Sequence, residues 1–213
     1  MRVIAVVSQK GGSGKTTVAT NLAVAALEDG KATLVLDLDQ QPSAFGWFQA
    51  RADKAGALQV VPTHHAAIPK LLEGAAAEGV ELVLIDTAPK TEPGARAAIE
   101  ACDVVLIPCQ PSAHDLRAIQ DTVELCRARG AKPFVVLNQV EATSPLTDEA
   151  RSALEAMDIA VLPEGLGLRR AFKHTATDGR GVTEFDKSGK AAAEIRDLYR
   201  AVTKLRSKKG KRP

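Results

Sequence analysis

Aromatic side chains and cysteines are scarce in this sequence of 213 residues. Phe, Trp and Tyr make up 3% of it, although apolar residues together make up 45%. The apolar fraction suffices for one well-packed domain, and the shortage of rings favours helices packed closely on a sheet of small and branched side chains. The cysteines are too few and wrongly spaced for a disulfide framework or a metal site. Cys102, Cys109 and Cys126 are therefore expected to be buried thiols in a reducing cytoplasm.

Long apolar runs are missing as well. The segment from Met1 to Val7 is mostly apolar but far too short for a signal peptide or a membrane span. It predicts a first strand that starts the fold at once. At the other end, residues 206–213 contain no bulky apolar side chain, so no amphipathic membrane helix is expected there.

The formal net charge of +2 conceals an uneven distribution. Residues 187–213 hold ten Lys or Arg against two acids, a net of +8, so the rest of the chain carries about −6. A basic end on an acidic body predicts an anionic partner, either nucleic acid or a lipid surface. A solvated tail explains the same composition equally well.

Short apolar runs alternate with helical patterns along the chain, which is typical of a parallel α/β sheet. Strands are expected over residues 2–7, 32–37, 58–61, 80–86, 103–108, 133–138 and 159–162. Helices are expected over residues 15–29, 43–54, 64–78, 94–101, 115–129, 147–157, 167–177 and 188–207. Runs such as 82–85 are apolar throughout, so these strands should be central and covered on both faces. The sequence predicts a single doubly wound, mostly parallel sheet over residues 1–206, a flexible basic tail over 207–213, and ligands at the carboxyl ends of the strands.

A glycine-rich stretch joins the first expected strand to the first expected helix. Its residues are Lys10, Gly11, Gly12, Ser13, Gly14, Lys15, Thr16 and Thr17. Glycines let successive backbone N–H groups turn toward phosphate oxygens, and the N-terminus of the helix adds its positive end. Lys15 is expected to reach the β- and γ-phosphates, and the Thr16 hydroxyl is expected to ligate Mg²⁺. The stretch predicts a P-loop nucleoside triphosphatase.

The loop departs from the usual pattern, because Gln9 replaces its first glycine and Lys10 precedes the glycine pair. In this it resembles the deviant phosphate loop of the ParA/MinD family of ATPases. In that family the extra lysine crosses an ATP-bound dimer and contacts the partner's phosphates. The resemblance implies that Lys10 acts in trans and that ATP joins two copies of the chain into a homodimer. Added positive charge would offset the repulsion between two triphosphates at such an interface.

The resemblance continues through two acidic strand ends. Residues 35–41 look like the family's second acidic motif, which implies that Asp39 positions or activates the attacking water and that Asp37 lies near the magnesium shell. Gln40-Gln41-Pro42 rearranges the Pro-Gln that usually follows this aspartate. Asp86 ends an apolar strand, where a carboxylate is costly unless it meets a cation or donors, and it is expected to hold a magnesium-bound water. Simple capping of the strand end is the alternative for Asp37 and Asp39.

Two later segments are candidates for contact with the adenine base, the first of them by resemblance to the family. Asn138 ends an expected strand and matches the residue that reads the adenine edge, since its amide offers both a donor and an acceptor. Pro163-Glu164-Gly165 follow another strand and are expected to flank the base. An ordinary turn is the alternative for Asn138. Trp47 and Phe48 are expected to pack in the core rather than to stack on a base.

The end of the chain separates the branches of the family. It lacks the membrane helix of MinD-type proteins, and the cysteines do not match relatives of the nitrogenase iron protein. The sequence therefore most resembles short partition-type ATPases without an N-terminal DNA-reading domain. Within the last expected helix, Ile195, Leu198, Val202 and Leu205 fall within one stripe of about 80° and are expected to pack.

The opposite side of that helix is basic. Its cations recur every four positions, at Arg196, Arg200, Lys204 and Lys208. Arg169 and Arg170 are expected to extend the same surface. Because no aromatic residues lie among these cations and no base-reading motif is present, they predict contact with the phosphates of double-stranded DNA without sequence preference. A solvated helix face is the alternative.

These residues and the resemblance together imply an ATP- and Mg²⁺-dependent ATPase that dimerises, binds nonspecific DNA and positions a cargo along the nucleoid. A ParB-like or cargo-linked adaptor protein is expected to stimulate hydrolysis, and no membrane contact is expected. The cargo can be a plasmid, a chromosome origin or a protein assembly. Two alternatives stay open: a metabolic P-loop enzyme similar to dethiobiotin synthetase, and a regulatory ATP switch that acts on a protein.

Overall fold

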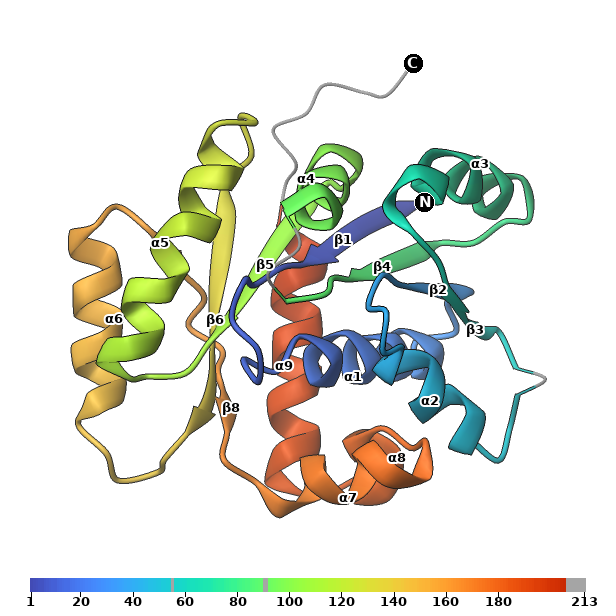
Figure 1. Ribbon diagram of the computed structural model, residues 1–213. Helices are drawn as coiled ribbons and strands as arrows, with labels where there is room; N and C mark the ends of the chain where they lie inside the picture. Colours follow the sequence, from blue (N-terminus) through green and yellow to red (C-terminus); the bar gives the residue numbers. More distant parts are fainter. Residues whose placement is uncertain (55, 90–91, 206–213) are drawn as a thin grey trace.

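Eight parallel strands form one sheet in the computed structural model (Figure 1), which describes residues 1–54, 56–89 and 92–205. The strands are β1 (Arg2–Val6), β2 (Thr33–Asp37), β3 (Leu58–Pro62), β4 (Leu82–Asp86), β5 (Val104–Cys109), β6 (Pro133–Val140), β7 (Ala160–Val161) and β8 (Leu166–Gly167). Their order across the sheet is β3-β2-β4-β1-β5-β6-β7, with β8 paired to the carboxyl end of β6. The predicted α/β class and parallel sheet are confirmed.

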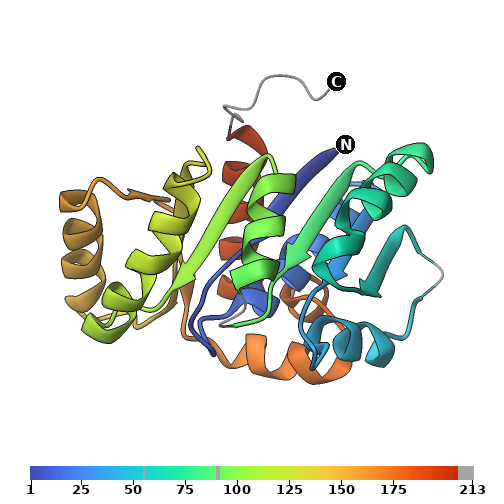
Figure 2. The same ribbon diagram turned by 45° about the horizontal axis from the view of Figure 1, so that its top comes forward.

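Helices cover both faces of the sheet (Figure 1 and Figure 2). One face carries α1 (Lys15–Glu28), α2 (Ser43–Ala50), α8 (Val182–Phe185) and α9 (Lys190–Lys204), with α7 (Arg170–Asp178) next to α2 and α8. The other face carries α3 (Ile68–Ala77), α4 (Glu92–Ala101), α5 (Ala113–Arg127) and α6 (Leu146–Ala156). In the described part of the chain, no helix combines the length and the apolar character needed to cross a bilayer.

The central strands are apolar because both of their faces are covered. In β4, Leu82 and Leu84 belong to the core shared with α1, whereas Val83 and Ile85 belong to the core shared with α4. This alternation follows from the two-residue period of a strand. A parallel strand between two helical layers therefore needs apolar residues at every position. The expected central place of residues 82–85 is confirmed.

Two helices are shorter than expected. The helix expected over residues 43–54 ends at Ala50, and the first turn of the one expected over 64–78 is a separate 3₁₀ turn, His65–Ala67, which precedes α3. Pro69 lies at the start of α3, where its missing N–H costs no helical hydrogen bond.

After residue 162, the observed elements differ more from the expected ones. The helix expected from residue 167 begins instead at Arg170, because β8 occupies Leu166–Gly167, and the four-residue helix α8 was not expected. Elements of two to four residues are too short to show a period in the sequence. Residues 206–213, which include the predicted tail and the end of the helix expected over 188–207, lie outside the described residues.

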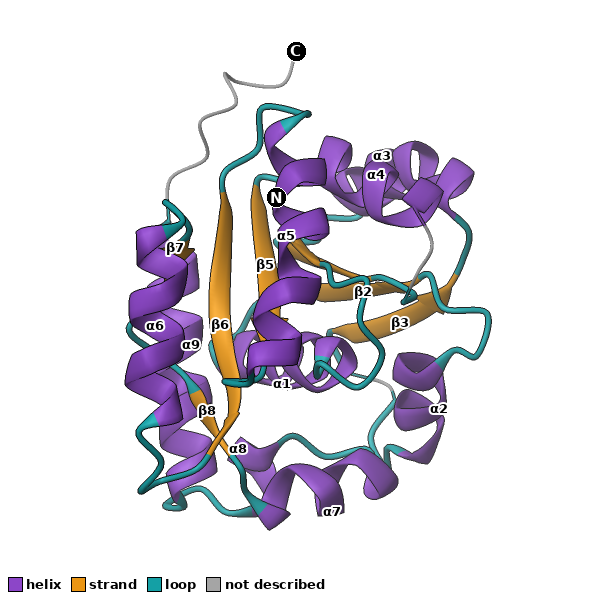
Figure 3. Cartoon of the chain, turned by 60° about the vertical axis from the view of Figure 1, so that its left-hand side comes forward, coloured by secondary structure: helices purple, strands orange, loops and turns teal. Residues whose placement is uncertain are grey.

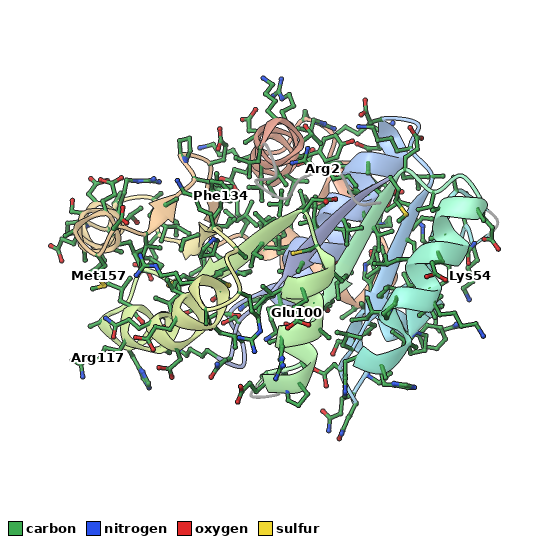
Figure 4. The ribbon with its side chains drawn as sticks, turned by 90° about the horizontal axis from the view of Figure 1, so that it is seen from above. Arg2, Lys54, Glu100, Arg117, Phe134 and Met157 are labelled. Carbon is green, nitrogen blue, oxygen red and sulfur yellow. The ribbon has the colours of Figure 1, made fainter. Side chains whose placement is uncertain are left out.

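The last helix packs as its apolar stripe predicts. The stripe is buried from Ile195 to Val202, and Leu205 packs against the same core. Arg2, at the start of β1, lies beside the end of α9 (Figure 4), where its guanidinium donates to the Thr203 carbonyl at 2.6 Å and also to the Leu205 carbonyl. A cation at the carboxyl end of a helix can donate hydrogen bonds to the last carbonyl groups of the helix and interacts favourably with the negative end of the helix dipole.

The helix α2 is held to α7 and α8 by buried polar contacts. Trp47 and Phe48 are buried, as expected of packing residues. The Trp47 Nε1–H donates to the Thr175 carbonyl at 3.1 Å. At the end of α2, Arg51 is 7% exposed and forms a two-pronged ion pair with Glu184 at 2.8 and 2.5 Å.

We expect Glu184→Ala to lower the free energy of unfolding by about 2–4 kcal/mol, because it leaves the Arg51 guanidinium buried without its carboxylate. Urea unfolding followed by circular dichroism measures this loss. Asp197→Ala is the matched control, since it removes an exposed ion pair with Arg200 and should cost less than about 1 kcal/mol. Similar small losses in both variants would contradict the importance of the buried pair.

Candidate functional site

The glycine-rich loop lies at the middle of the carboxyl edge of the sheet. It follows β1, which lies between β4 and β5, and it leads into α1 at Lys15. The helix α2 lies beside α1, and α7 lies beside α2 on the same side of the molecule (Figure 3). Ligands of parallel α/β sheets bind at this edge, outside the carboxyl ends of the strands.

Two glycines shape the loop for an anion. Gly12 and Gly14 have φ values of 75° and 98°, in the left-handed region that favours glycine. Gly14 is the N-cap of α1, and no side chain caps this helix. The first N–H groups of α1 are therefore free of a side-chain acceptor, and such an N-terminus attracts phosphate.

A cavity of about 390 Å³ opens beside the loop. Gly11 to Thr17 contribute most of the loop to its wall, while Ser43 and Trp47 in α2 and Phe172 in α7 form the side away from the sheet. The wall of the cavity is thus formed by the phosphate loop together with α2, which is near the loop in the sequence, and α7, which is far from it.

Lys15 is buried at the floor of this site. Its Nζ donates to the Lys10 carbonyl at 3.2 Å. Burial lowers the pKa of Lys15, while the charges of Asp86 and Asp39 act in the opposite direction. A lysine between carboxylates and a cluster of N–H groups is placed to neutralise a phosphate.

Asp86 has the surroundings of a magnesium-site carboxylate. The Thr16 hydroxyl donates to its Oδ2 at 2.7 Å, whereas its Oδ1 is buried and has no partner among the described residues. The pKa of Asp86 is raised to about 7, mainly by burial. A nearby cation would relieve that cost, and a hydroxyl with a carboxylate forms the oxygen donor set that Mg²⁺ prefers. The residues present therefore fit this ion.

Asp37 and Asp39 have different surroundings. Asp37 pairs in register with Asp86 and is fully buried, and its two oxygens accept the N–H groups of Asp39 and Phe45 at 3.1 and 3.0 Å. It thereby holds the segment that carries Asp39. Asp39 lines the cavity and accepts the Gln41 N–H at 3.0 Å.

Lys10 points to the start of α5. Its Nζ lies 2.5 Å from Oδ2 of Asp115, a carboxylate that is 4% exposed and also accepts the Ser112 hydroxyl. Within one copy of the chain, the Lys10 ammonium is therefore paired with an internal carboxylate. Its predicted contact with a partner's phosphates stays a prediction.

Asn138 lies behind the loop. Its Nδ2 donates to the Ser13 carbonyl at 2.8 Å, and its Oδ1 accepts the Gln139 N–H at 2.9 Å. Gly165 approaches the same strand, since a Cβ there would lie 3.1 Å from the Leu137 carbonyl. The fold brings Asn138 together with the loop and with residues 163–165, and contact with adenine stays a prediction.

The predicted basic row of α9 is less uniform than its spacing suggests. Arg200 forms an exposed ion pair with Asp197 in the preceding turn. Arg196 is half-buried and donates to the Lys187 carbonyl at 2.7 Å, while Lys204 is exposed in the last turn. Lys208 lies outside the described residues.

The two arginines expected to extend this surface also differ. Arg169 is held by Glu194 of α9 at 2.5 Å, and this pairing raises the pKa of the guanidinium. Arg170 begins α7 and is exposed. Arg169 therefore ties α7 to α9, and Arg170 is the more available of the two for an anionic partner.

Several residues of the site were not predicted. These residues are Asp115, Gln110, Gln139 and Phe172. The side-chain amides of Gln110 and Gln139 both lie against the Gly12 carbonyl, and Phe172 lines the cavity. Each is about a hundred residues or more away along the sequence from the part of the loop region that it meets, so no local pattern could reveal these contacts.

Comparisons with known proteins agree with this geometry. Residues 4–179 match the family described as the CobQ/CobB/MinD/ParA nucleotide binding domain. The chain is 33% identical over 205 residues to the maintenance of carboxysome distribution protein A of Gloeobacter kilaueensis, covering 94% of this chain and 92% of that one. It is 32% identical over 146 residues to the chromosome-partitioning ATPase Soj of Thermus thermophilus, covering 56% of this chain and 59% of that one.

A solved structure gives the same fold. The MinD cell division protein of Aquifex aeolicus superposes with a TM-score of 0.81 at 17% identity, covering 96% of this chain and 98% of that one. The family match spans most of the chain and includes the phosphate loop, the three aspartates and Asn138. The chain therefore belongs to the CobQ/CobB/MinD/ParA family of nucleotide-binding domains.

Proposed function

We propose that this chain is an Mg²⁺-dependent ATPase of the ParA type, which ATP joins into a homodimer that binds nonspecific double-stranded DNA. The observation that carries the proposal is the loop with two lysines, Lys10 and Lys15, beside a Thr16–Asp86 pair whose Oδ1 has no partner in the described part of the chain. The family match supports nucleotide binding at this loop.

The roles of the phosphate-binding residues follow from their surroundings. Lys15 and the N–H groups at the start of α1 bind the β- and γ-phosphates. When bound, Mg²⁺ neutralises charge on the phosphate oxygens. The Thr16 hydroxyl and Asp86 would hold that ion, and Asp37 fixes the segment that carries Asp39. Asp39, at the cavity wall, orients the attacking water.

The base is assigned to the carboxyl end of β6. Asn138 and Pro163-Glu164-Gly165 lie there, and Oε2 of Glu164 is a buried oxygen without a partner among the described residues. Such an oxygen suits an amino group such as that of adenine, because a buried acceptor gains from any donor that reaches it.

The ATP-bound dimer presents two copies of the basic surface formed by Arg196, Arg200, Lys204, Arg169 and Arg170. We infer that a ParB-like or cargo-linked adaptor stimulates hydrolysis and so releases the chain from DNA. The relatives named for carboxysome distribution and for chromosome partitioning support a cargo-positioning role, with the ATP form associated with the nucleoid.

Asp39→Ala should still bind ATP and dimerise but hydrolyse ATP very slowly, because the water loses its orienting carboxylate. Lys15 and Thr16 are untouched, so nucleotide affinity is expected to change little. Phosphate release with adaptor and DNA present measures the effect. Hydrolysis at the wild-type rate would assign water orientation to another residue.

Lys10→Ala should separate nucleotide binding from dimerisation. Loop N–H groups and Lys15 act within one subunit, so binding to the monomer survives, while the contact with the partner is lost. Sedimentation with a nonhydrolysable ATP analogue measures the dimer. Because alanine leaves Asp115 buried without its cation, the control is Lys10→Ala combined with Asp115→Asn, which should also stay monomeric. A wild-type dimer in both variants would refute the role in trans.

A further inference from the structure

Three side-chain amides hold carbonyl groups of the phosphate loop. Gln110, just after β5, donates its Nε2–H to the Gly12 carbonyl at 3.0 Å. Gln139 donates to the same carbonyl at 3.4 Å. Asn138 donates to the next carbonyl, that of Ser13, at 2.8 Å. Two consecutive peptide groups of the loop are thus fixed from outside by the ends of two neighbouring strands.

Fixing a carbonyl also fixes the N–H group of the same peptide. In a planar trans peptide, the C=O and the following N–H point in opposite directions. A Gly12 carbonyl turned to the glutamines therefore directs the Ser13 N–H the other way, and a Ser13 carbonyl turned to Asn138 does the same for the Gly14 N–H. Successive N–H groups on one side of a loop form an anion-binding concavity.

The backbone of β6 is distorted so that neighbouring residues reach the loop together. Successive side chains of a regular strand point to opposite faces, yet Asn138 and Gln139 both contact the loop. Gln139 has φ of 56°, and the register of β6 with β8 shifts between Asn138 and Val140. A left-handed residue other than glycine is uncommon, and this one turns the Gln139 amide toward Gly12.

The contact of Asn138 with the loop is close. Asn138 is 3% exposed, and a Cβ placed on Gly14 would lie 1.9 Å from its Nδ2. The loop can therefore approach Asn138 only because residue 14 is glycine. The amide and the glycine fit each other, independently of any base.

We propose that Gln110, Asn138 and Gln139 are positioning residues that hold the phosphate loop in its anion-binding shape before the ligand arrives. The inference rests on the nucleotide site proposed above and adds that these amides act on the phosphate part of the ligand. A preorganised set of donors binds an anion more tightly because no reorganisation is needed on binding.

A ligand without a base tests this inference. Calorimetry would compare ADP with pyrophosphate on the full chain, on Asn138→Ala, and on Gln110→Ala and Gln139→Gly singly and combined. Glycine at 139 removes the amide but accepts the left-handed backbone, so that variant keeps its fold. Gln120→Ala, an exposed glutamine of α5 that contacts Met157, is the matched control.

Asn138→Ala should weaken the binding of pyrophosphate about tenfold, which is typical of one lost hydrogen bond, and it should weaken the binding of ADP at least as much, because Asn138 is also assigned to the base. Each single glutamine variant should lower the affinity for both ligands by less than about threefold, because the other amide still holds the Gly12 carbonyl. The combined variant should lower both affinities about tenfold. The free energy of unfolding of the combined variant and the affinities of Gln120→Ala should stay at the wild-type values.

Two results would overturn the inference. If Asn138→Ala weakens the binding of ADP but leaves the binding of pyrophosphate unchanged, Asn138 acts on the base alone. A combined glutamine variant with wild-type affinity for pyrophosphate would show that the loop keeps its shape without the amides. Wild-type protein that binds neither ligand would instead contradict the proposed nucleotide site itself.

Discussion

Lys15→Ala is expected to abolish tight ATP binding. Lys15 is buried beside the loop, and its Nζ has only the Lys10 carbonyl as acceptor among the described residues. The substitution removes the main charge that faces the β- and γ-phosphates. Each charged hydrogen bond of this kind contributes roughly 1.5–3 kcal/mol, about a tenfold to hundredfold change in affinity. Calorimetric titration with ATP and Mg²⁺ measures the loss.

The matched control for this variant is Lys70→Ala. Lys70 is an exposed lysine of α3, on the face of the sheet opposite α1, so its removal changes the net charge equally without touching the loop. ATP affinity should stay at the wild-type value in Lys70→Ala. Unchanged affinity in Lys15→Ala would reject the placement of the phosphate loop.

Reversal of Arg196, Arg200 and Lys204 to Glu should abolish DNA binding while ATP binding and dimerisation persist. These residues lie opposite the buried stripe of α9, so the fold should survive. Each phosphate contact contributes about 0.9 to the slope of log affinity against log salt, so three contacts in each of two subunits contribute a slope near 5. A salt titration of the ATP-bound protein on two unrelated duplexes measures both affinity and slope.

A reversal with the same net charge, Lys54, Lys70 and Arg117 to Glu, is the control. These are exposed residues outside α9, and Lys54 and Arg117 lie at the sides of the molecule away from α9 (Figure 4). This control should keep most of the affinity, because long-range charge is screened within about 10 Å at 0.1 M salt. Equal losses in both reversals would mean that overall charge, rather than α9, governs binding.

The sheet and the phosphate loop could be predicted because their signals are local. Asp86 follows four buried apolar residues of β4, and Lys15 follows a glycine at the start of a helix. Parallel strands bring their carboxyl ends to one edge, so the approach of Thr16 to Asp86 follows from the order of elements alone.

The supporting contacts could not be predicted because they depend on tertiary packing. Lys10 meets Asp115, and Gln110 meets the Gly12 carbonyl, across about a hundred residues of sequence. The left-handed backbone of Gln139 has no local signal, since glycine and asparagine are the residues that usually mark such a position. The same packing gives Arg169 and Arg200 acidic partners that their spacing did not indicate.

Binding of a nonspecific DNA duplex by the wild-type chain in three nucleotide states tests the central claim most directly. The states are Mg²⁺ with a nonhydrolysable ATP analogue, Mg²⁺ with ADP, and no nucleotide, at one moderate salt concentration. We expect tight binding only with the ATP analogue, because only that state joins two basic surfaces across Lys10. Equal binding in all three states, or none in any, would contradict an ATP-controlled DNA-binding dimer.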